Sequence, residues 1–123
     1  MNNILIINYI PPTANERENL ARTNKFLSAK VKKENTNKIK NMVLSQKIKK
    51  FDEDNIVYMN ITFNISNFNR DEDNLIACFK YINDGLVLAG IIKNDTIKHL
   101  RIKNIEYNKV KKDNQSIVIE FIQ

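Results

Sequence analysis

The middle of the chain contains a segment in which two kinds of side chain alternate. Between residues 55 and 66, one of the two alternating sets is wholly apolar: Val57, Met59, Ile61, Phe63 and Ile65. Successive side chains of a β-strand point to opposite faces of a sheet, so a period of two predicts a strand with one buried face. The rest of the chain must therefore supply elements that cover this face.

Two further elements are expected before this strand. Residues 4–10 are rich in β-branched side chains and predict a first strand, which Pro11 and Pro12 end because proline lacks a backbone N–H donor. Residues 13–28 show no sustained apolar period and contain several asparagines, so we expect a long loop there, in which a short helical turn stays open. Residues 29–51 place apolar side chains at three- and four-residue spacing, which predicts a lysine-rich helix.

Three more elements are expected after the strand. Residues 73–89 have a broad apolar face and predict a second helix, which Gly90 would end. Residues 97–110 and 116–122 predict two strands, and the turn residues 112–114 between them indicate a terminal hairpin. The order is β-α-β-α-β-β. We therefore expect a single α+β domain over residues 1–123, with two principal helices on a small, mainly antiparallel sheet.

Positive charge is concentrated in two parts of the chain. The 123 residues include 20 Lys or Arg and 14 Asp or Glu, a formal net charge of +6. Residues 17–50 hold eleven of the cations against two acids, and residues 93–112 hold seven against two. Such an excess favours a polyanionic partner such as nucleic acid, because each cation that reaches a phosphate releases condensed counterions. The simpler alternative stays open, since lysines on a solvated helix face also keep a protein in solution.

The scarce residue types exclude several classes of site. A single cysteine, Cys78, rules out an internal disulfide and a cysteine-based zinc site. A single histidine, His99, rules out a histidine-rich metal site, and two glycines do not make a phosphate-binding loop. The N-terminal apolar run of about seven residues is too short to span a membrane and lacks the basic start of a signal peptide. We therefore expect a cytoplasmic protein without a membrane partner.

An acidic cluster before the second predicted helix carries the clearest chemical signal. Asp71 and Asp73 are two residues apart, so in an extended backbone both carboxylates point the same way. Two hard oxygen ligands suit Mg²⁺ or Mn²⁺, and a third carboxylate such as Asp95 would complete a site that activates water for attack on a phosphate. Carboxylates at a helix N-terminus also serve as caps, and this alternative stays open.

Four short motifs follow one another along residues 4–95. A first strand leads to Pro-Pro-Thr-Ala-Asn at residues 11–15, and residues 70–75 read Arg-Asp-Glu-Asp-Asn-Leu. A helix then reaches Asp-Gly-Leu at residues 84–86, and a turn follows with Ala-Gly-Ile-Ile-Lys-Asn-Asp at residues 89–95. In the order and spacing of these motifs the sequence resembles the RusA family of Holliday junction resolvases.

The resemblance implies a fold and an activity. RusA-like enzymes are small homodimeric endonucleases that resolve four-way DNA junctions with Mg²⁺ in recombination and repair, and phages or prophages often encode them. By position, Asp71, Asp73 and Asp95 correspond to the family's metal-binding catalytic carboxylates, and we expect Mn²⁺ to substitute for Mg²⁺. The chain departs from the family at Ala77, where some members carry lysine, and at Asn94, where the family turn usually has aspartate.

Several basic residues are candidates for contacts with branched DNA. Lys80 lies two helical turns after Asp73 and would stabilise charge at the scissile phosphate as a catalytic residue, although a helical pair with Asp84 explains it equally well. The expected DNA-binding residues are Arg22, Lys25, Lys32, Lys33 and Arg70. Two other functions stay open: a non-catalytic DNA-binding protein of the same fold with a degenerate metal site, and a basic protein-interaction module.

Overall fold

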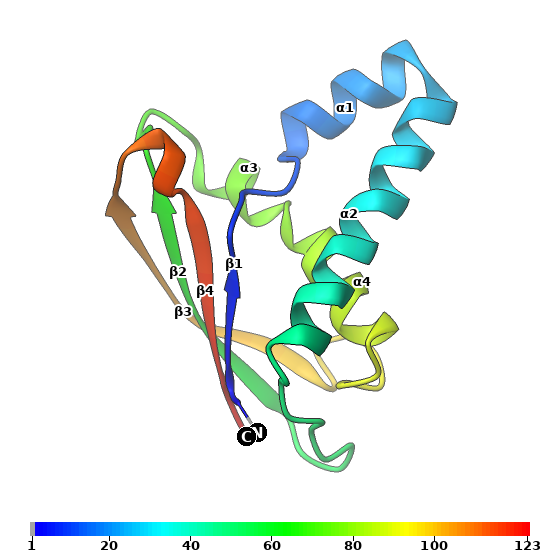
Figure 1. Cartoon of the computed structure of the whole chain (residues 1–123), viewed down its shortest axis with the longest axis vertical. Helices are drawn as coiled ribbons and strands as arrows, with labels where there is room; N and C mark the ends of the chain where they lie inside the picture. Colours follow the sequence, from blue (N-terminus) through cyan, green and yellow to red (C-terminus); the bar gives the residue numbers. More distant parts are fainter. Residues whose placement is uncertain (1) are drawn as a thin grey trace.

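A mixed sheet of four strands forms one side of the molecule. The computed structural model describes residues 2–123, and the strands are β1 (Ile4–Ile7), β2 (Val57–Ile65), β3 (Leu100–Lys109) and β4 (Ser116–Ile122). Their order across the sheet is β1-β4-β2-β3 (Figure 1). β4 runs antiparallel to both β1 and β2, whereas β2 and β3 are parallel. The α+β class is therefore confirmed, and the sheet is mixed.

β2 has the alternation that its sequence predicts. Every second residue from Val57 to Ile65 is buried, and the residues between them are half-buried. Phe63 lies on the buried face, with its ring centre 5.6 Å from that of Tyr107 on β3 and 6.0 Å from that of Phe79. Burying a side chain of this size stabilises a fold by about 1.5–3 kcal/mol. The apolar face of β2 is therefore a principal part of the core.

Four helices lie on the same side of this sheet (Figure 1). They are α1 (Ala14–Thr23), α2 (Lys25–Ser45), α3 (Glu72–Ile76) and α4 (Phe79–Leu88). The longest of them, α2, has 21 residues and carries many lysines. None of the helices in residues 2–123 combines the length and the apolar composition that a membrane span requires.

Most of residues 13–28 is helical, so the prediction of a long loop there is wrong. Asn24 is the C-cap of α1 and the N-cap of α2, and its side chain accepts a hydrogen bond from the Leu27 backbone N–H at 3.0 Å. None of the α1 side chains is buried, which explains why no apolar period marks this helix in the sequence. Its alanine, glutamate, arginine and leucine residues instead favour a helix through their intrinsic propensity.

The two predicted helices differ from the observed ones at their ends. α2 begins at Lys25 and stops at Ser45, well before residue 51, because Lys47 adopts a left-handed backbone with a φ of 56°. The helix predicted over residues 73–89 is divided into α3 and α4. At the division the Cys78 N–H donates to the carbonyl oxygen of Leu75 at 3.0 Å, a three-residue step that is tighter than an α-helical turn.

β3 and β4 do not pair with each other in the described chain, so the predicted terminal hairpin is wrong. A short 3-10 helix, η1 (Lys112–Asn114), joins them, and β4 then lies between β1 and β2. Burial explains this arrangement. β4 buries Ile117, Ile119 and Phe121, whereas most of β3 is exposed and carries charged side chains that suit an edge strand.

The contact between α2 and α4 depends on a residue without a side chain. Gly85 of α4 is buried, and it faces Ile39 of α2, which is also buried. A Cβ atom at Gly85 would lie 2.5 Å from Cγ2 of Ile39 and 2.6 Å from its Cβ. An added methyl group would therefore force the two helices apart, so glycine sets their spacing.

We expect Gly85→Ala to lower the free energy of unfolding by about 1–3 kcal/mol, because the methyl group overpacks this helix contact. Urea unfolding measures the loss as a lower midpoint at an unchanged m value. In an Ile39→Ala background the contact with Cγ2 is absent but the contact with the Cβ of residue 39 at 2.6 Å remains, so the same substitution should cost less there than in the parent without becoming neutral. A Gly85→Ala protein as stable as the parent would contradict the tight contact.

Candidate functional site

The acidic segment, residues 70–75, follows β2 and begins α3. Asp71 occupies the N-cap position of α3 and Asp73 lies in its first turn, and both side chains are exposed. The Asp71 carboxylate makes no capping hydrogen bond, whereas that of Asp73 accepts one from the Asn74 backbone N–H at 2.9 Å. Within residues 2–123 neither carboxylate forms an ion pair. Both carboxylates are therefore accessible to a ligand at this helix end.

Glu72, between the two aspartates, attaches α3 to the sheet. Its Oε2 accepts a hydrogen bond from the Tyr107 hydroxyl of β3 at 2.7 Å. The Tyr107 ring stacks on Phe63, and burial together with the bond to Glu72 raises the pKa of Tyr107 well above its usual value. Sequence analysis did not find this contact, because the two residues are 35 positions apart and nothing local links them.

Two motifs that are far apart in the sequence meet at the start of α1. The backbone N–H of Asn15 donates to Oδ1 of Asn74 at 2.9 Å, across 59 positions of sequence. Asn15 belongs to the proline motif at residues 11–15, and Asn74 belongs to the acidic segment. The bond places the beginning of α1 beside α3, so the two motifs form one region of the surface.

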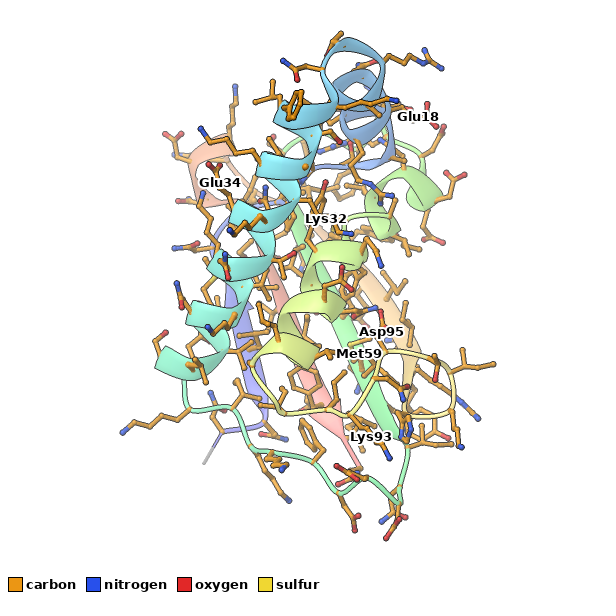
Figure 2. All side chains as sticks on the ribbon, turned by 90° about the vertical axis from the view of Figure 1, so that its right-hand side faces the viewer. Glu18, Lys32, Glu34, Met59, Lys93 and Asp95 are labelled. Atoms are coloured by element: carbon orange, nitrogen blue, oxygen red, sulfur yellow. The ribbon has the colours of Figure 1, made fainter. Side chains whose placement is uncertain are left out.

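Asp95 lies in the loop that joins α4 to β3, where it is half-buried (Figure 2). Its carboxylate forms no ion pair within residues 2–123. Oδ1 of the preceding residue, Asn94, accepts hydrogen bonds from the backbone N–H and the hydroxyl of Thr96, at 3.2 and 2.7 Å. Asn94 therefore shapes this loop, and its amide oxygen is already engaged.

The three predicted ligands do not form a metal centre in this arrangement. Asp71 and Asp73 lie at the start of α3, whereas Asp95 follows α4 in the chain. Across residues 2–123, no three His, Cys, Asp or Glu side chains form a group that could hold a metal ion. The site predicted for Mg²⁺ thus consists of two neighbouring carboxylates and a third that is not grouped with them.

The residues predicted to bind DNA occupy two places. Four of them are exposed on the last turn of α1 and the first half of α2, and we call this set the basic corner: Arg22, Lys25, Lys32 and Lys33. The fifth, Arg70, is half-buried at the acidic segment, where it lines a cavity of about 240 Å³ together with Glu72 and Tyr107. Most of the predicted cations therefore lie on α1 and α2, and Arg70 belongs to the region of the acids.

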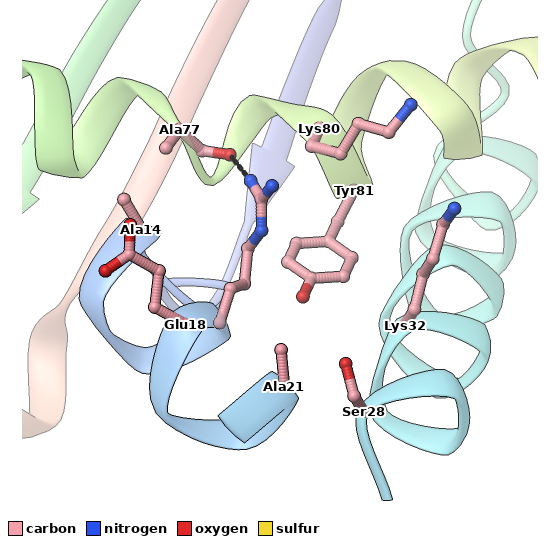
Figure 3. A pocket seen from close by; sticks show the side chains of 9 residues that line it. Ala14, Glu18, Ala21, Ser28, Lys32, Ala77, Lys80 and Tyr81 are labelled. Carbon is pink, nitrogen blue, oxygen red and sulfur yellow. Dashed lines mark hydrogen bonds between the residues drawn. The ribbon is translucent and has the colours of Figure 1, made fainter. Parts of the chain in front are cut away.

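Lys80 lines a cleft between α1, α2 and α4 (Figure 3). The cleft has a volume of about 370 Å³, and none of the three predicted metal ligands lines it. Nζ of Lys80 lies 3.4 Å from Oδ1 of Asp84, which is the helical pair considered from the sequence. Because half of the Lys80 side chain is exposed, such a pair contributes only a few tenths of a kcal/mol.

Arg17 of α1 is a cation of this cleft that sequence analysis did not identify as a site residue. Its Nη1 donates to the carbonyl oxygen of Ala77 at 2.9 Å, and its guanidinium carbon lies 5.8 Å from the centre of the Tyr81 ring. Tyr81 is buried, and this burial raises the pKa of its hydroxyl. Because a loop is expected for this segment, the sequence predicts no position for Arg17. The observed helix, α1, places Arg17 beside α4.

The relation of this chain to known proteins is judged from its own sequence motifs. No protein-family model and no curated protein matches the chain, so the resemblance to RusA resolvases rests on its motifs. Two of those motifs are in contact through Asn15 and Asn74.

We expect Tyr107→Phe to lower the free energy of unfolding at neutral pH by about 0.5–1.5 kcal/mol, because it removes the hydrogen bond to Glu72. The pKa of Tyr107 is raised by folding, so its stabilising contribution is present below the unfolded-state pKa of about 10 and is lost as the pH rises above that value. Urea unfolding near neutral pH and above pH ~10 measures both effects. The difference between parent and variant should be smaller at the higher pH.

Tyr58→Phe is the matched control, since it removes a hydroxyl from β2 that takes no part in the side-chain hydrogen bonds found in residues 2–123. Its stability should follow that of the parent at both pH values. If the two variants lose the same small amount, Glu72 and Tyr107 do not hold α3 against the sheet.

Proposed function

We propose that this chain is a RusA-like endodeoxyribonuclease that cuts four-way DNA junctions by paired strand nicking, in DNA recombination and repair. The contact between Asn15 and Asn74 carries the proposal, because it joins two motifs of the resemblance into one region at 2.9 Å. The exposed carboxylates of Asp71 and Asp73 belong to the same region. Paired nicking needs two such regions, so a homodimer is part of the proposal.

The charge of the chain supports DNA as the substrate. The net charge is +6, and the basic corner consists of four exposed cations on the last turn of α1 and the first half of α2. Contacts with phosphates position a duplex but carry little information about base sequence. Selectivity for a junction would therefore come from the shape of the DNA and from the spacing of the two acidic segments in the dimer.

Mg²⁺ is the cation that the resemblance implies, with Mn²⁺ as its substitute. The carboxylates of Asp71 and Asp73 offer the hard oxygen ligands that either ion prefers. Asp95 is not grouped with them within residues 2–123, so a three-carboxylate site does not fit the described arrangement.

A non-catalytic DNA-binding protein of the same fold is the second candidate. The separation of Asp95 from the acid pair favours it, and so does Asn94, whose amide oxygen is engaged by Thr96. In such a protein the acidic segment would begin α3 and attach it to the sheet through Glu72. The basic corner would then bind DNA without any cutting.

Incubation with a labelled synthetic four-way junction tests the proposal, with linear duplex alongside and with Mg²⁺, Mn²⁺ or EDTA added. We expect symmetric paired nicks in the junction only, and none in EDTA. Asp71→Asn and Asp73→Asn should each lower the cutting rate roughly 100-fold, because each removes a charged metal ligand. Junction binding in EDTA should stay within about two-fold of the parent, since the variants keep the cations that grip the phosphates.

Asp54→Asn is the matched control, because Asp54 is an exposed aspartate in the turn before β2. It should cut the junction as fast as the parent. Tight junction binding without nicks in either metal would reject the nuclease and support the second candidate. Failure to bind any DNA at low salt would contradict both candidates and favour the basic protein-interaction module.

A further inference from the structure

The cleft between α1, α2 and α4 brings together cations from three different helices. Arg17 comes from α1, Lys32 from α2 and Lys80 from α4, around a volume of about 370 Å³. Figure 3 shows the side chains of Lys32 and Lys80 extending toward the same end of the cleft. Converging like charges cost free energy in the unliganded protein, and an anion bound between them would remove that cost.

Small side chains keep the space between these cations open. The lining includes three alanines and a serine: Ala14, Ala21, Ala77 and Ser28. The ring of Tyr81 lies between the two sides, with its hydroxyl directed toward Ala21 and Ser28 (Figure 3). The cleft therefore has a hydroxyl and an aromatic face in addition to its charges.

The charge balance of the cleft favours an anion. Its lining holds three cations and one acid, Glu18, and Asp84 outside the lining pairs with Lys80 at 3.4 Å, so these five groups together carry a formal charge of +1. Within residues 2–123, Lys32 forms no ion pair. Arg17 uses one of its five N–H donors on the Ala77 carbonyl oxygen, and that bond holds the guanidinium at the cleft while other donors remain.

We infer that this cleft is a phosphate-binding site that holds the backbone of a DNA strand. The inference rests on the proposed DNA-binding function and names a surface outside the acidic segment. Guanidinium and ammonium groups bind phosphate oxygens through charge-assisted hydrogen bonds. The volume of about 370 Å³ lies in the lower part of the range for sites that hold small ligands, which suits one nucleotide unit. Lys80 is then a phosphate-binding residue of this cleft rather than a catalytic one.

A double substitution, Lys32→Gln with Lys80→Gln, tests the site through the salt dependence of DNA binding in EDTA. The slope of log K against log salt concentration should become shallower by about two, since each cation that meets a phosphate contributes close to one. The dissociation constant at fixed moderate salt should rise roughly ten-fold or more. Circular dichroism and urea unfolding check that the variant folds as the parent does.

Lys30→Gln with Lys98→Gln removes the same charge outside the cleft and is the matched control. Lys30 pairs with Glu34 on α2 at 3.9 Å, Lys98 precedes β3, and neither lines the cleft. For this control variant, the slope of log K against log salt concentration should change by less than one. If the control and the cleft variant weaken DNA binding equally while the parent binds DNA, the inference is wrong and the proposed function stands.

Amide NMR shifts of the parent protein distinguish the source of the phosphate. A short single-stranded oligonucleotide, a nucleoside monophosphate and inorganic phosphate are titrated separately, and the amides of Ala21, Ser28 and Ala77 report on the cleft. We expect the oligonucleotide to shift them at the lowest concentration. If none of the three titrated molecules shifts these amide signals, the inference is wrong. Shifts with inorganic phosphate in a protein that binds no DNA would support a site for free phosphate and reject the proposed function.

Discussion

β2 lies between β3 and β4 and buries one complete face, from Val57 to Ile65. Because that face must be covered from one side, the helices gather there, and the spacing of α2 and α4 follows from the missing side chain of Gly85. The chain leaves β2 at Ile65 and enters the acidic segment a few residues later. The hydrogen bond that Tyr107 donates to Glu72 then holds α3 against β3. The position of the acids thus depends on the most regularly buried strand of the sheet.

Elements with periodic burial could be predicted from the sequence, and elements without it could not. The alternation in β2 and the apolar spacing in α2 and α4 are direct consequences of burial on one face. α1 buries no side chain, so its sequence has no apolar period and predicts a loop instead of a helix. The turn residues at η1 predicted a connection correctly. They did not determine the partner of β4, because partner choice depends on which strand has more apolar surface to bury.

The candidate site was predictable only where its residues are close in sequence. Asp71 and Asp73 begin a helix as expected, whereas the grouping of Asp95 with them required a tertiary arrangement that the structure does not have. The contacts that sequence analysis missed all join distant segments, as Arg17 does with Ala77 and Tyr81. α1 connects the two charged regions, since its first turn touches Asn74 and its last turn carries Arg22 into the basic corner.

α1 is a helix of ten residues without a buried side chain, and polar bonds hold it in place at both ends. Asn15 is bound to Asn74, Arg17 is bound to Ala77, and Asn24 joins it to α2. A helix with so little burial opens locally at a free-energy cost far below that of global unfolding. The cleft therefore has one wall formed by the packed helices α2 and α4, and a second wall, α1, whose amide protons we expect to exchange more readily than those of the core. Any molecule that bridges the two walls must also restrain α1, so affinity and the rigidity of that helix are thermodynamically linked.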